Sequence, residues 1–153
     1  MVKTVLVTGA GGTIGRLVRK HLSDRYNLRL MTHHPIDAPS HVADIADLDA
    51  ILPAFEGADA VVHLAATVSV LAPWDAVLPA NLIGTYNVYE AAKRMGVPCV
   101  VFASSNHAVG MYEVEGAPSI YALDDPRVID HHAEIRPDSY YGVSKAYGEA
   151  MGR

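Results

Sequence analysis

The chain has 153 residues, 50% of them hydrophobic and 19% charged, which is enough for one globular domain with its own core and too short for two. Its net charge of −5 and the lack of a basic run argue against a nucleic-acid-binding surface, and no apolar run approaches the roughly 18 residues of a membrane span. The single cysteine, Cys99, excludes a disulfide framework and favours a reducing compartment, so we expect a cytoplasmic protein with neither a nucleic-acid nor a membrane partner.

Apolar, β-branched segments alternate with amphipathic segments along the whole chain. Strands are predicted at residues 5–7, 28–31, 41–44, 59–64 and 97–103. Helices are predicted at residues 14–22, 48–55, 79–95 and 139–153, with residues 106–138 mostly in loops. Because the strand segments are continuously apolar rather than alternating, helices should cover both faces of the sheet. The pattern predicts one α/β domain, residues 1–153, built on a doubly wound, Rossmann-like parallel sheet with strand order 3-2-1-4-5.

A glycine-rich turn joins the first predicted strand to the first predicted helix. Gly9, Gly12 and Gly15 stand in a GxxGxxG spacing. The first glycine permits a tight turn, the second lets the backbone approach a pyrophosphate, and the third lets the helix pack closely on the strand. A diphosphate would then lie at the helix N-terminus, against free N–H groups. The turn predicts a dinucleotide-binding site, with an ordinary glycine-rich turn as the alternative.

The second predicted strand leaves the choice between NAD and NADP open, with NAD the first choice. NAD calls for a carboxylate where this strand ends, but His33 and His34 stand there and the nearest acid, Asp37, lies beyond a proline. An arginine would suit a 2′-phosphate, yet Arg29 points by alternation away from the strand's last residue. A histidine contact with a 2′-phosphate is one interpretation, and solvated loop histidines are the other. Asp44, after the third strand, is a candidate acceptor for the adenine amino group or else a turn aspartate.

Polar side chains follow the fifth predicted strand, and a tyrosine and a lysine stand four residues apart in the last predicted helix. The run Ser104–His107 emerges at the carboxyl end of the strand, where ligands bind in open parallel sheets. Tyr141 and Lys145 project from one helix face, and a nearby ammonium favours the phenolate form of a tyrosine. Tyr141 is therefore a candidate general acid/base, with Ser105 bonding to the reacting oxygen.

Six motifs in this order resemble the extended short-chain dehydrogenase/reductases, the NAD-dependent epimerase/dehydratase superfamily, over essentially the whole chain. The motifs are Thr8–Gly15, Asp44, His63–Ala66, Asn81–Thr85, Ser104-Ser105 and Tyr141–Lys145. The resemblance implies Ser105, Tyr141 and Lys145 as a catalytic triad, with Lys145 also holding the nicotinamide ribose. It implies Asp44 at the adenine and Ala65 in the cofactor groove. The cofactor contacts expected in full, with Asn81 on the nicotinamide side, are Gly9, Gly11, Gly12, Thr13, Ile14, Gly15, Asp44, Ile45, Leu64, Ala65, Ala66, Asn81, Ala103, Tyr141 and Lys145.

Two segments, residues 102–110 and 136–142, are similar to the uronate dehydrogenase branch and to related sugar dehydrogenases of haloarchaea. This likeness implies an NAD(P)-dependent oxidoreductase that takes hydride from the anomeric carbon of a sugar or sugar acid, with Tyr141 as general base. The alternatives are a nucleotide-sugar epimerase or dehydratase and a non-catalytic NAD(P)-binding module. Substrate contacts are expected from Ser69, Ser105, Asn106 and His107. For the last two, tying down the loop backbone is the alternative.

The stretch from Tyr112 to Ile135 is longer than the uronate dehydrogenase pattern suggests and is rich in acidic residues, which indicates a solvated loop or a substrate lid. His131 and His132 have no further ligand at metal-binding spacing, so no metal site is predicted. The chain extends about two helical turns beyond Lys145, so we expect the later strands and the substrate domain of an extended dehydrogenase to lie outside these residues. The fifth strand should then form an exposed apolar edge, which predicts a homo-oligomer.

Overall fold

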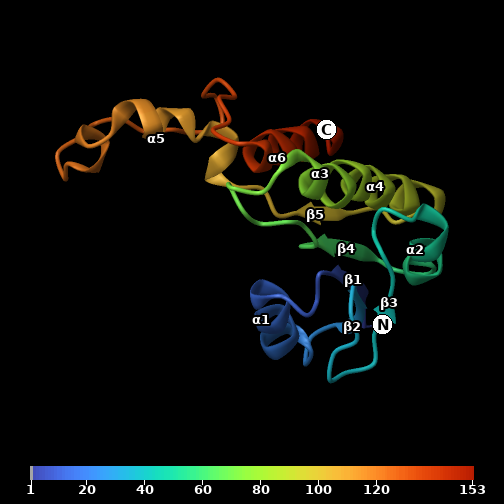
Figure 1. Ribbon diagram of the computed structural model, residues 1–153. Helices are drawn as coiled ribbons and strands as arrows, with labels where there is room; N and C mark the ends of the chain where they lie inside the picture. The colour runs from blue at the N-terminus through green and yellow to red at the C-terminus, as the bar shows by residue number, and fades with distance from the viewer. Residues whose placement is uncertain (1) are drawn as a thin grey trace.

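A parallel sheet of five strands forms the centre of the molecule (Figure 1). The computed structural model describes residues 2–153. The strands are β1 (Thr4–Thr8), β2 (Asn27–Thr32), β3 (His41–Val42), β4 (Ala60–His63) and β5 (Val100–Phe102). They pair in the order β3-β2-β1-β4-β5, and every pair is parallel. This confirms the predicted α/β class and strand order. The third and fifth strands are shorter than predicted.

Helices cover both faces of this sheet, as its apolar strands require. The helices longer than one turn are α1 (Thr13–Leu22), α2 (Leu48–Phe55), α4 (Gly84–Arg94), α5 (Met111–Gly116) and α6 (Tyr140–Met151). One apolar cluster, which includes Leu6, Phe55 and Val88, packs α2 and α4 against one face. A second cluster, which includes Val7 and Val18, packs α1 against the other face. The two clusters bury the strand segments that the sequence marks as apolar.

The two helices that begin at polar residues do so as predicted. The Asp47 carboxylate accepts a hydrogen bond from the Ala50 N–H at 3.0 Å and caps α2. The Ser139 hydroxyl accepts from the Gly142 N–H at 3.1 Å and caps α6. The second cap matters for the site, because it fixes the start of α6, and Tyr141 lies in the first turn of that helix.

The helix predicted at residues 79–95 begins earlier than the sequence indicates. Helix α3 (Trp74–Val77) runs into a π-helical turn, η1 (Leu78–Ile83), and then into α4. Pro79 therefore lies in the first turn of η1 but inside the helical run that begins at Trp74, not at the start of that run. Proline supplies no N–H to the helical ladder, and the π-helical turn coincides with this break.

The helical spacing of Ile14, Leu17, Val18 and Leu22 predicts one apolar face, which α1 buries only in part. Ile14 is 57% exposed and Leu17 is 51% exposed. Val18, which belongs to the expected face, packs against the sheet, and Gly15 is buried beside it. A Cβ at Gly15 would lie 2.5 Å from the Gly9 carbonyl oxygen, so α1 packs directly on the preceding turn at this position.

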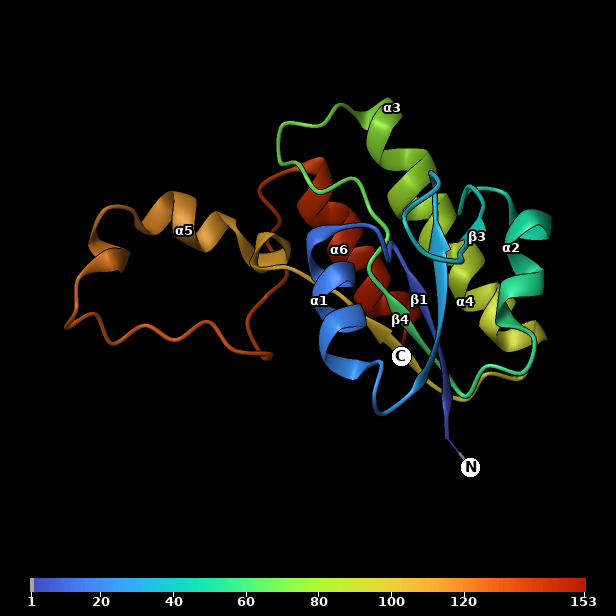
Figure 2. The ribbon, with the colours of Figure 1, turned by 90° about the horizontal axis from the view of Figure 1, so that it is seen from below.

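The segment between β5 and α6 forms an arm that projects from the rest of the molecule (Figure 2). It contains a short 3-10 helix, η2 (Asn106–Val109), then α5 and another 3-10 turn, η3 (Ser119–Tyr121), so the prediction of a mostly irregular loop is only partly right. Backbone hydrogen bonds close the base of the arm, where Arg136 donates to Ala108 at 3.1 Å and accepts from Met111 at 2.9 Å.

Strand β5 forms one edge of the sheet, and its Val101 side chain is 55% exposed. The predicted apolar edge is therefore present. Among the residues that the structure describes, no helix combines the length and apolarity needed to cross a bilayer.

Candidate functional site

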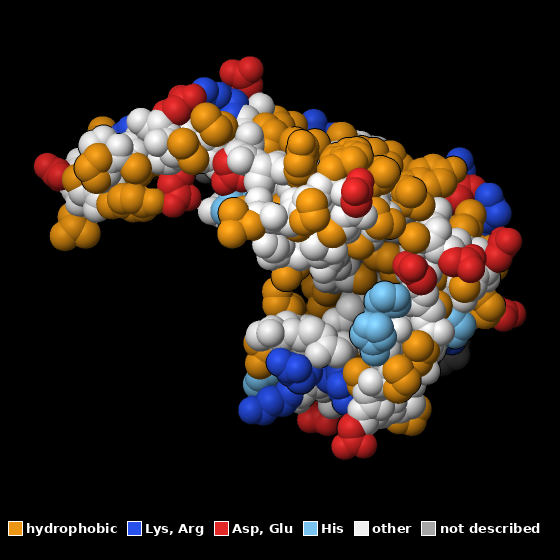
Figure 3. All heavy atoms as spheres, viewed as in Figure 1, with side chains coloured by type: hydrophobic (Ala, Val, Ile, Leu, Met, Phe, Trp, Pro, Cys, Tyr) orange, Lys and Arg blue, Asp and Glu red, His pale blue; other side chains and the backbone are white. Residues whose placement is uncertain are grey.

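A cavity of about 900 Å³ opens at the carboxyl ends of the strands. Parallel strands end at the same edge of a sheet, so the loops that follow them converge there. Figure 3 shows the molecule hollowed on this side, between α1 and the arm. Every predicted cofactor contact except Asn81 lines the cavity: Gly9, Gly11, Gly12, Thr13, Ile14, Gly15, Asp44, Ile45, Leu64, Ala65, Ala66, Ala103, Tyr141 and Lys145.

The glycine turn forms one wall of the cavity and is packed too tightly for side chains. Gly9 has φ +66°, and a Cβ there would lie 2.7 Å from the Ala65 nitrogen. A Cβ at Gly15 would lie 2.5 Å from the Gly9 carbonyl oxygen. Gly12 precedes α1 without a side-chain cap, and the first turn of α1 has no acidic residue. The N–H groups of the first turn of α1 are therefore available to an anion. Together with the glycine turn, they fit the pyrophosphate of a dinucleotide.

A buried histidine supports the opposite wall, formed by the loop after β4. The Thr8 hydroxyl oxygen accepts from the N–H groups of Leu64 and Ala65, each at 3.2 Å, and lies 2.7 Å from His63 Nδ1. Thr8 therefore donates its own proton to Nδ1, and Nε2 donates to the Thr85 hydroxyl at 3.2 Å. Burial lowers the pKa of His63 to about 3, so the ring is neutral. Sequence reasoning missed this role, although a histidine inside an apolar strand signals a buried, bonded ring.

Helix α6 brings Tyr141 and Lys145 to the same cavity. Lys145 is 5% exposed, and its ammonium donates to the Ala103 carbonyl at 2.7 Å. The same nitrogen lies 5.5 Å from the centre of the Tyr141 ring and 4.8 Å from that of Phe102. Burial lowers the pKa of Lys145 to about 8. An anchored cation beside a phenol is the arrangement that favours the phenolate.

Of the two serines after β5, only Ser104 lines the same cavity as this pair. Its hydroxyl bonds to Glu149 of α6. The Ser105 hydroxyl accepts from the His107 N–H at 3.2 Å and donates to the Asn106 side chain at 3.4 Å, so it caps η2. Both expected substrate contacts that follow Ser105 thus also take part in ordering their own loop.

His107 is held against Tyr141 by a carboxylate that sequence reasoning did not single out. The two rings lie 5.8 Å apart, edge to face, and His107 Nδ1 lies 2.6 Å from Asp138 Oδ2. Burial opposes ionisation of Asp138, but hydrogen bonds from His107 and Ser139 keep the pKa of its carboxyl below the usual value. A Cβ at Gly142 would lie 2.2 Å from the His107 carbonyl oxygen, so this glycine lets η2 pack directly on α6.

Five predicted contacts do not line the cavity: Ser105, Asn106 and His107, described above, and Asn81 and Ser69. Asn81 is buried, accepts from the Thr67 N–H at 2.7 Å and donates to the Ser144 hydroxyl at 2.9 Å. It therefore ties η1 to the loop after β4 and to α6, behind the cavity wall. Ser69 is exposed, and its hydroxyl accepts from the Leu71 N–H at 3.2 Å within a local turn.

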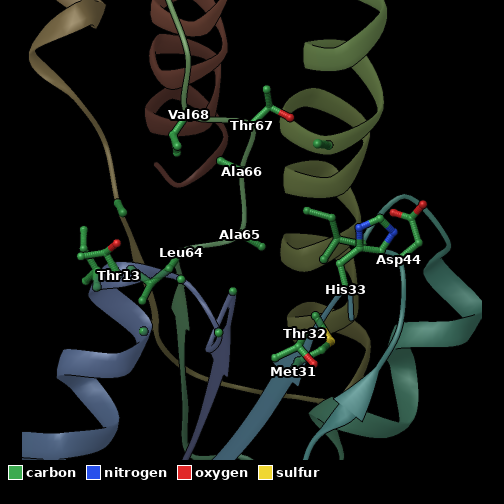
Figure 4. A pocket seen from close by; sticks show the side chains of 18 of the residues that line it. Thr13, Met31, Thr32, His33, Asp44, Leu64, Ala65, Ala66, Thr67 and Val68 are labelled. Carbon is green, nitrogen blue, oxygen red and sulfur yellow. The ribbon is translucent and has the colours of Figure 1, made fainter. Parts of the chain in front are cut away.

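The far end of the cavity is formed by the segments after β2 and β3. Asp44 lines this end of the cavity (Figure 4). One of its carboxylate oxygens also accepts from the Ala46 N–H at 2.9 Å, so the residue stabilises its own turn as well. Thr32, His33 and His34 line the cavity from the end of β2. The site therefore runs from these residues, past the glycine turn, to Tyr141, a length that suits an extended ligand.

The model of the NAD dependent epimerase/dehydratase family matches residues 5–153. The chain belongs to this family. The matched residues include the glycine turn, the loop after β4 and the tyrosine–lysine pair of α6.

Several relatives of the chain are named as sugar or sugar-acid dehydrogenases. The chain is 40% identical over 164 residues to the NAD-dependent glucose-6-phosphate dehydrogenase of Haloferax volcanii, covering 100% of this chain and 63% of that protein. It is 44% identical to the L-arabinose 1-dehydrogenase (NAD(P)(+)) of the same organism, covering 97% of this chain and 59% of the relative. A uronate dehydrogenase mutant from Agrobacterium tumefaciens, complexed with NAD, superposes with a TM-score of 0.83 at 36% identity, covering 99% of this chain and 55% of that one. The chain thus spans less than two thirds of the length of these proteins.

Proposed function

We propose that the protein is an NAD(P)-dependent oxidoreductase that oxidises a sugar or sugar acid at its anomeric carbon. The observation that carries this proposal is one cavity that joins the glycine turn to the Tyr141–Lys145 pair. A dinucleotide that lies along the turn would bring its far end toward this pair. The sugar dehydrogenases among the relatives support the same substrate class.

The residues of the chain divide the work between binding and proton transfer. The first turn of α1 binds the pyrophosphate and Asp44 contacts the adenine. When bound, the nicotinamide accepts the hydride that leaves the anomeric carbon. Tyr141, as phenolate, takes the proton of the anomeric hydroxyl, so that a lactone forms. Lys145, anchored on Ala103, stabilises the phenolate and contacts the nicotinamide ribose.

Substrate orientation falls to the polar run after β5. Ser105 donates to the reacting oxygen, and Asn106 and His107 bond to hydroxyl groups of the sugar, with Ser69 as a further contact. The ring of His107 lies against Tyr141, so a sugar within reach of one is within reach of the other. Asn81 supports the nicotinamide side through Thr67 rather than by direct contact.

Replacing the proposed base tests the proposal. Tyr141→Phe removes the hydroxyl and should lower NAD(P)H formation, followed at 340 nm with glucuronate, galacturonate, glucose 6-phosphate and arabinose, by about 10²–10⁴-fold. The dissociation constant of the cofactor should stay within about twofold, because the ring remains. Tyr140→Phe is the matched control, since that side chain is 55% exposed and packs on Trp74. A full-length protein that oxidises none of these sugars contradicts the proposal.

A second candidate activity is that of a nucleotide-sugar epimerase or dehydratase, because the family is described by these two reactions. Such an enzyme would isomerise or dehydrate a UDP-sugar with no net change of its cofactor, which chromatography of the products separates from dehydrogenation. Binding of NAD or NADP with no turnover that depends on Tyr141 would instead indicate a binding module.

We also propose that the protein works as a homo-oligomer in the cytoplasm. The exposed apolar edge at β5 supports association of copies, because unpaired edges are usually covered. The thiol of Cys99 is exposed and unpaired in the described structure, which suits a reducing compartment.

A further inference from the structure

The ammonium of Lys145 is buried without an anionic partner. Lys145 is 5% exposed, and its ammonium donates to a neutral acceptor, the Ala103 carbonyl, at 2.7 Å. Within residues 2–153 no carboxylate forms an ion pair with it, and Glu149, one turn farther along α6, bonds to the Ser104 hydroxyl instead. Burial favours loss of the proton, so the interactions that keep Lys145 charged beside Tyr141 come from neutral groups.

One of these neutral groups is the aromatic ring of Phe102, at the end of β5. The centre of the ring lies 4.8 Å from Lys145 Nζ, within the range of a cation–π contact. The face of an aromatic ring carries partial negative charge, so it attracts a cation without adding a group that titrates. Such contacts are strongest where water is excluded, as it is around this buried ammonium.

The surrounding elements hold the Phe102 ring in place and bring no charge to it. A Cβ at Gly148 would lie 2.2 Å from Phe102 Cζ, so the lack of a side chain there lets the ring lie directly against α6. The His63 ring of β4 lies 5.7 Å from the Phe102 ring, and the Tyr89 ring of α4 lies 6.4 Å from it. Both flanking rings are neutral, because burial lowers the pKa of His63 to about 3 and raises the pKa of Tyr89.

We propose that Phe102 is a positioning residue, whose ring keeps the Lys145 ammonium charged and fixed where it stabilises the Tyr141 phenolate. The inference rests on the proposed function, because it adds a residue to the same proton-transfer step. Phe102 does not line the cavity, so it acts through Lys145 and not by contact with the cofactor or the sugar. An aliphatic side chain would fill the same space but would not attract the cation.

Phe102→Leu in the full-length protein tests this role. With its ammonium held less firmly in the charged form, Lys145 should stabilise the phenolate less, so Tyr141 should ionise at a higher pH. The acidic limb of the pH profile of kcat should move upward by about half a pH unit or more. The KM for the sugar and the dissociation constant of NAD, measured by calorimetry, should stay within about twofold, because Phe102 lies outside the cavity.

A second variant keeps the size of the ring and changes only its charge distribution. Phe102→2,6-difluorophenylalanine places fluorines on the Cδ atoms, away from Gly148, and withdraws electrons from the ring face. The acidic limb should shift in the same direction as in Phe102→Leu, by a smaller amount. The same replacement at Phe55, the other phenylalanine of this sequence, is the matched control, because that ring lies in the core cluster with α2. It should leave the profile unchanged.

Ionisation of Tyr141 can also be followed without turnover, as the phenolate absorbance that Tyr141→Phe removes from a pH titration. An acidic limb and a phenolate titration that stay at the wild-type pH in both Phe102 variants overturn the inference and leave the proposed function intact. A kcat that falls equally at every pH also overturns it, because the ring would then serve packing alone. A shifted phenolate titration in a protein that oxidises no sugar contradicts the proposed function and leaves the link from Phe102 to Tyr141 in place.

Discussion

The carboxylate of Asp138 illustrates how single residues prepare this site. A Cβ at Gly110 would lie 2.1 Å from its Oδ2, and one at Gly142 would lie 3.2 Å from its Oδ1, so two glycines leave room for this group. The ionised carboxylate accepts from His107 Nδ1 at 2.6 Å and from the Ser139 hydroxyl at 2.7 Å. The bond between Asp138 and His107 fixes the proton on Nδ1 and leaves Nε2 as the ring nitrogen for the proposed substrate role. Asp138 is therefore a positioning residue for His107.

Asp138→Asn keeps the shape of the side chain and removes its charge. Loss of a charge-assisted hydrogen bond should raise KM for the sugar by about 10-fold or more, with a smaller change in kcat. The dissociation constant of the cofactor should not change, because Asp138 does not line the cofactor cavity. Asp130→Asn, an exposed aspartate of the arm that bonds the His132 N–H, is the control. A KM that is unchanged, or that rises equally in the control, would rule out this positioning role.

At the scale of elements, one buried histidine joins β1, β4 and α4. His63 on β4 bonds to Thr8 of β1 and to Thr85 of α4, and burial lowers its pKa to about 3 from an unfolded value near 6.5. Between these values the unfolded chain binds a proton that the folded chain does not. The stability contributed by neutral His63 is therefore complete above about pH 6.5 and declines as the pH falls toward 3.

His63→Gln should reduce this acid sensitivity. Wild-type protein should lose about 2 kcal/mol of unfolding free energy through this group between pH 6.5 and pH 5, at about 1.4 kcal/mol per pH unit. The variant should be less stable at pH 7 by about 1–3 kcal/mol, because Thr8 or Thr85 loses a buried partner, yet its stability should depend less on pH. Urea unfolding at several pH values measures both effects, with the exposed His21→Gln as control. Equal pH slopes for wild type and His63→Gln would show that another group dominates the acid response.

The sequence predicts the parts of these elements that depend on local chemistry. Periodicity, the caps at Asp47 and Ser139 and the spacing of Tyr141 and Lys145 involve residues a few positions apart. The pairing of His107 with Asp138 spans 31 positions, and no local pattern marks it. The exposure of Ile14 and the π-helical turn at residues 78–83 likewise depend on how helices pack in space.

At the scale of the whole molecule, exposed apolar side chains gather over α4 and α6 (Figure 3). Ile83, Tyr86 and Val143 are each between 41% and 45% exposed. The two helices pack against each other, and the Tyr89 hydroxyl of α4 donates to the Gly148 carbonyl of α6 at 3.2 Å, so their exposed side chains lie on adjoining surfaces. The β5 edge, with Val101, is a second apolar surface. We predict that the α4–α6 face makes the contact between copies, because contiguous exposed apolar patches mark interaction surfaces.

Sedimentation equilibrium or native mass spectrometry should give a mass of at least twice that of one chain. Tyr86→Lys/Val143→Lys places two charges on the α4–α6 face and should shift the protein toward the monomer, because a buried, unpaired ammonium is strongly unfavourable. Val42→Lys, at the opposite edge of the sheet, is the matched control and should leave the mass unchanged. Dissociation by Val101→Lys instead would assign the contact to β5. A wild-type protein that stays monomeric at micromolar concentration would show that these apolar faces do not join copies of the chain.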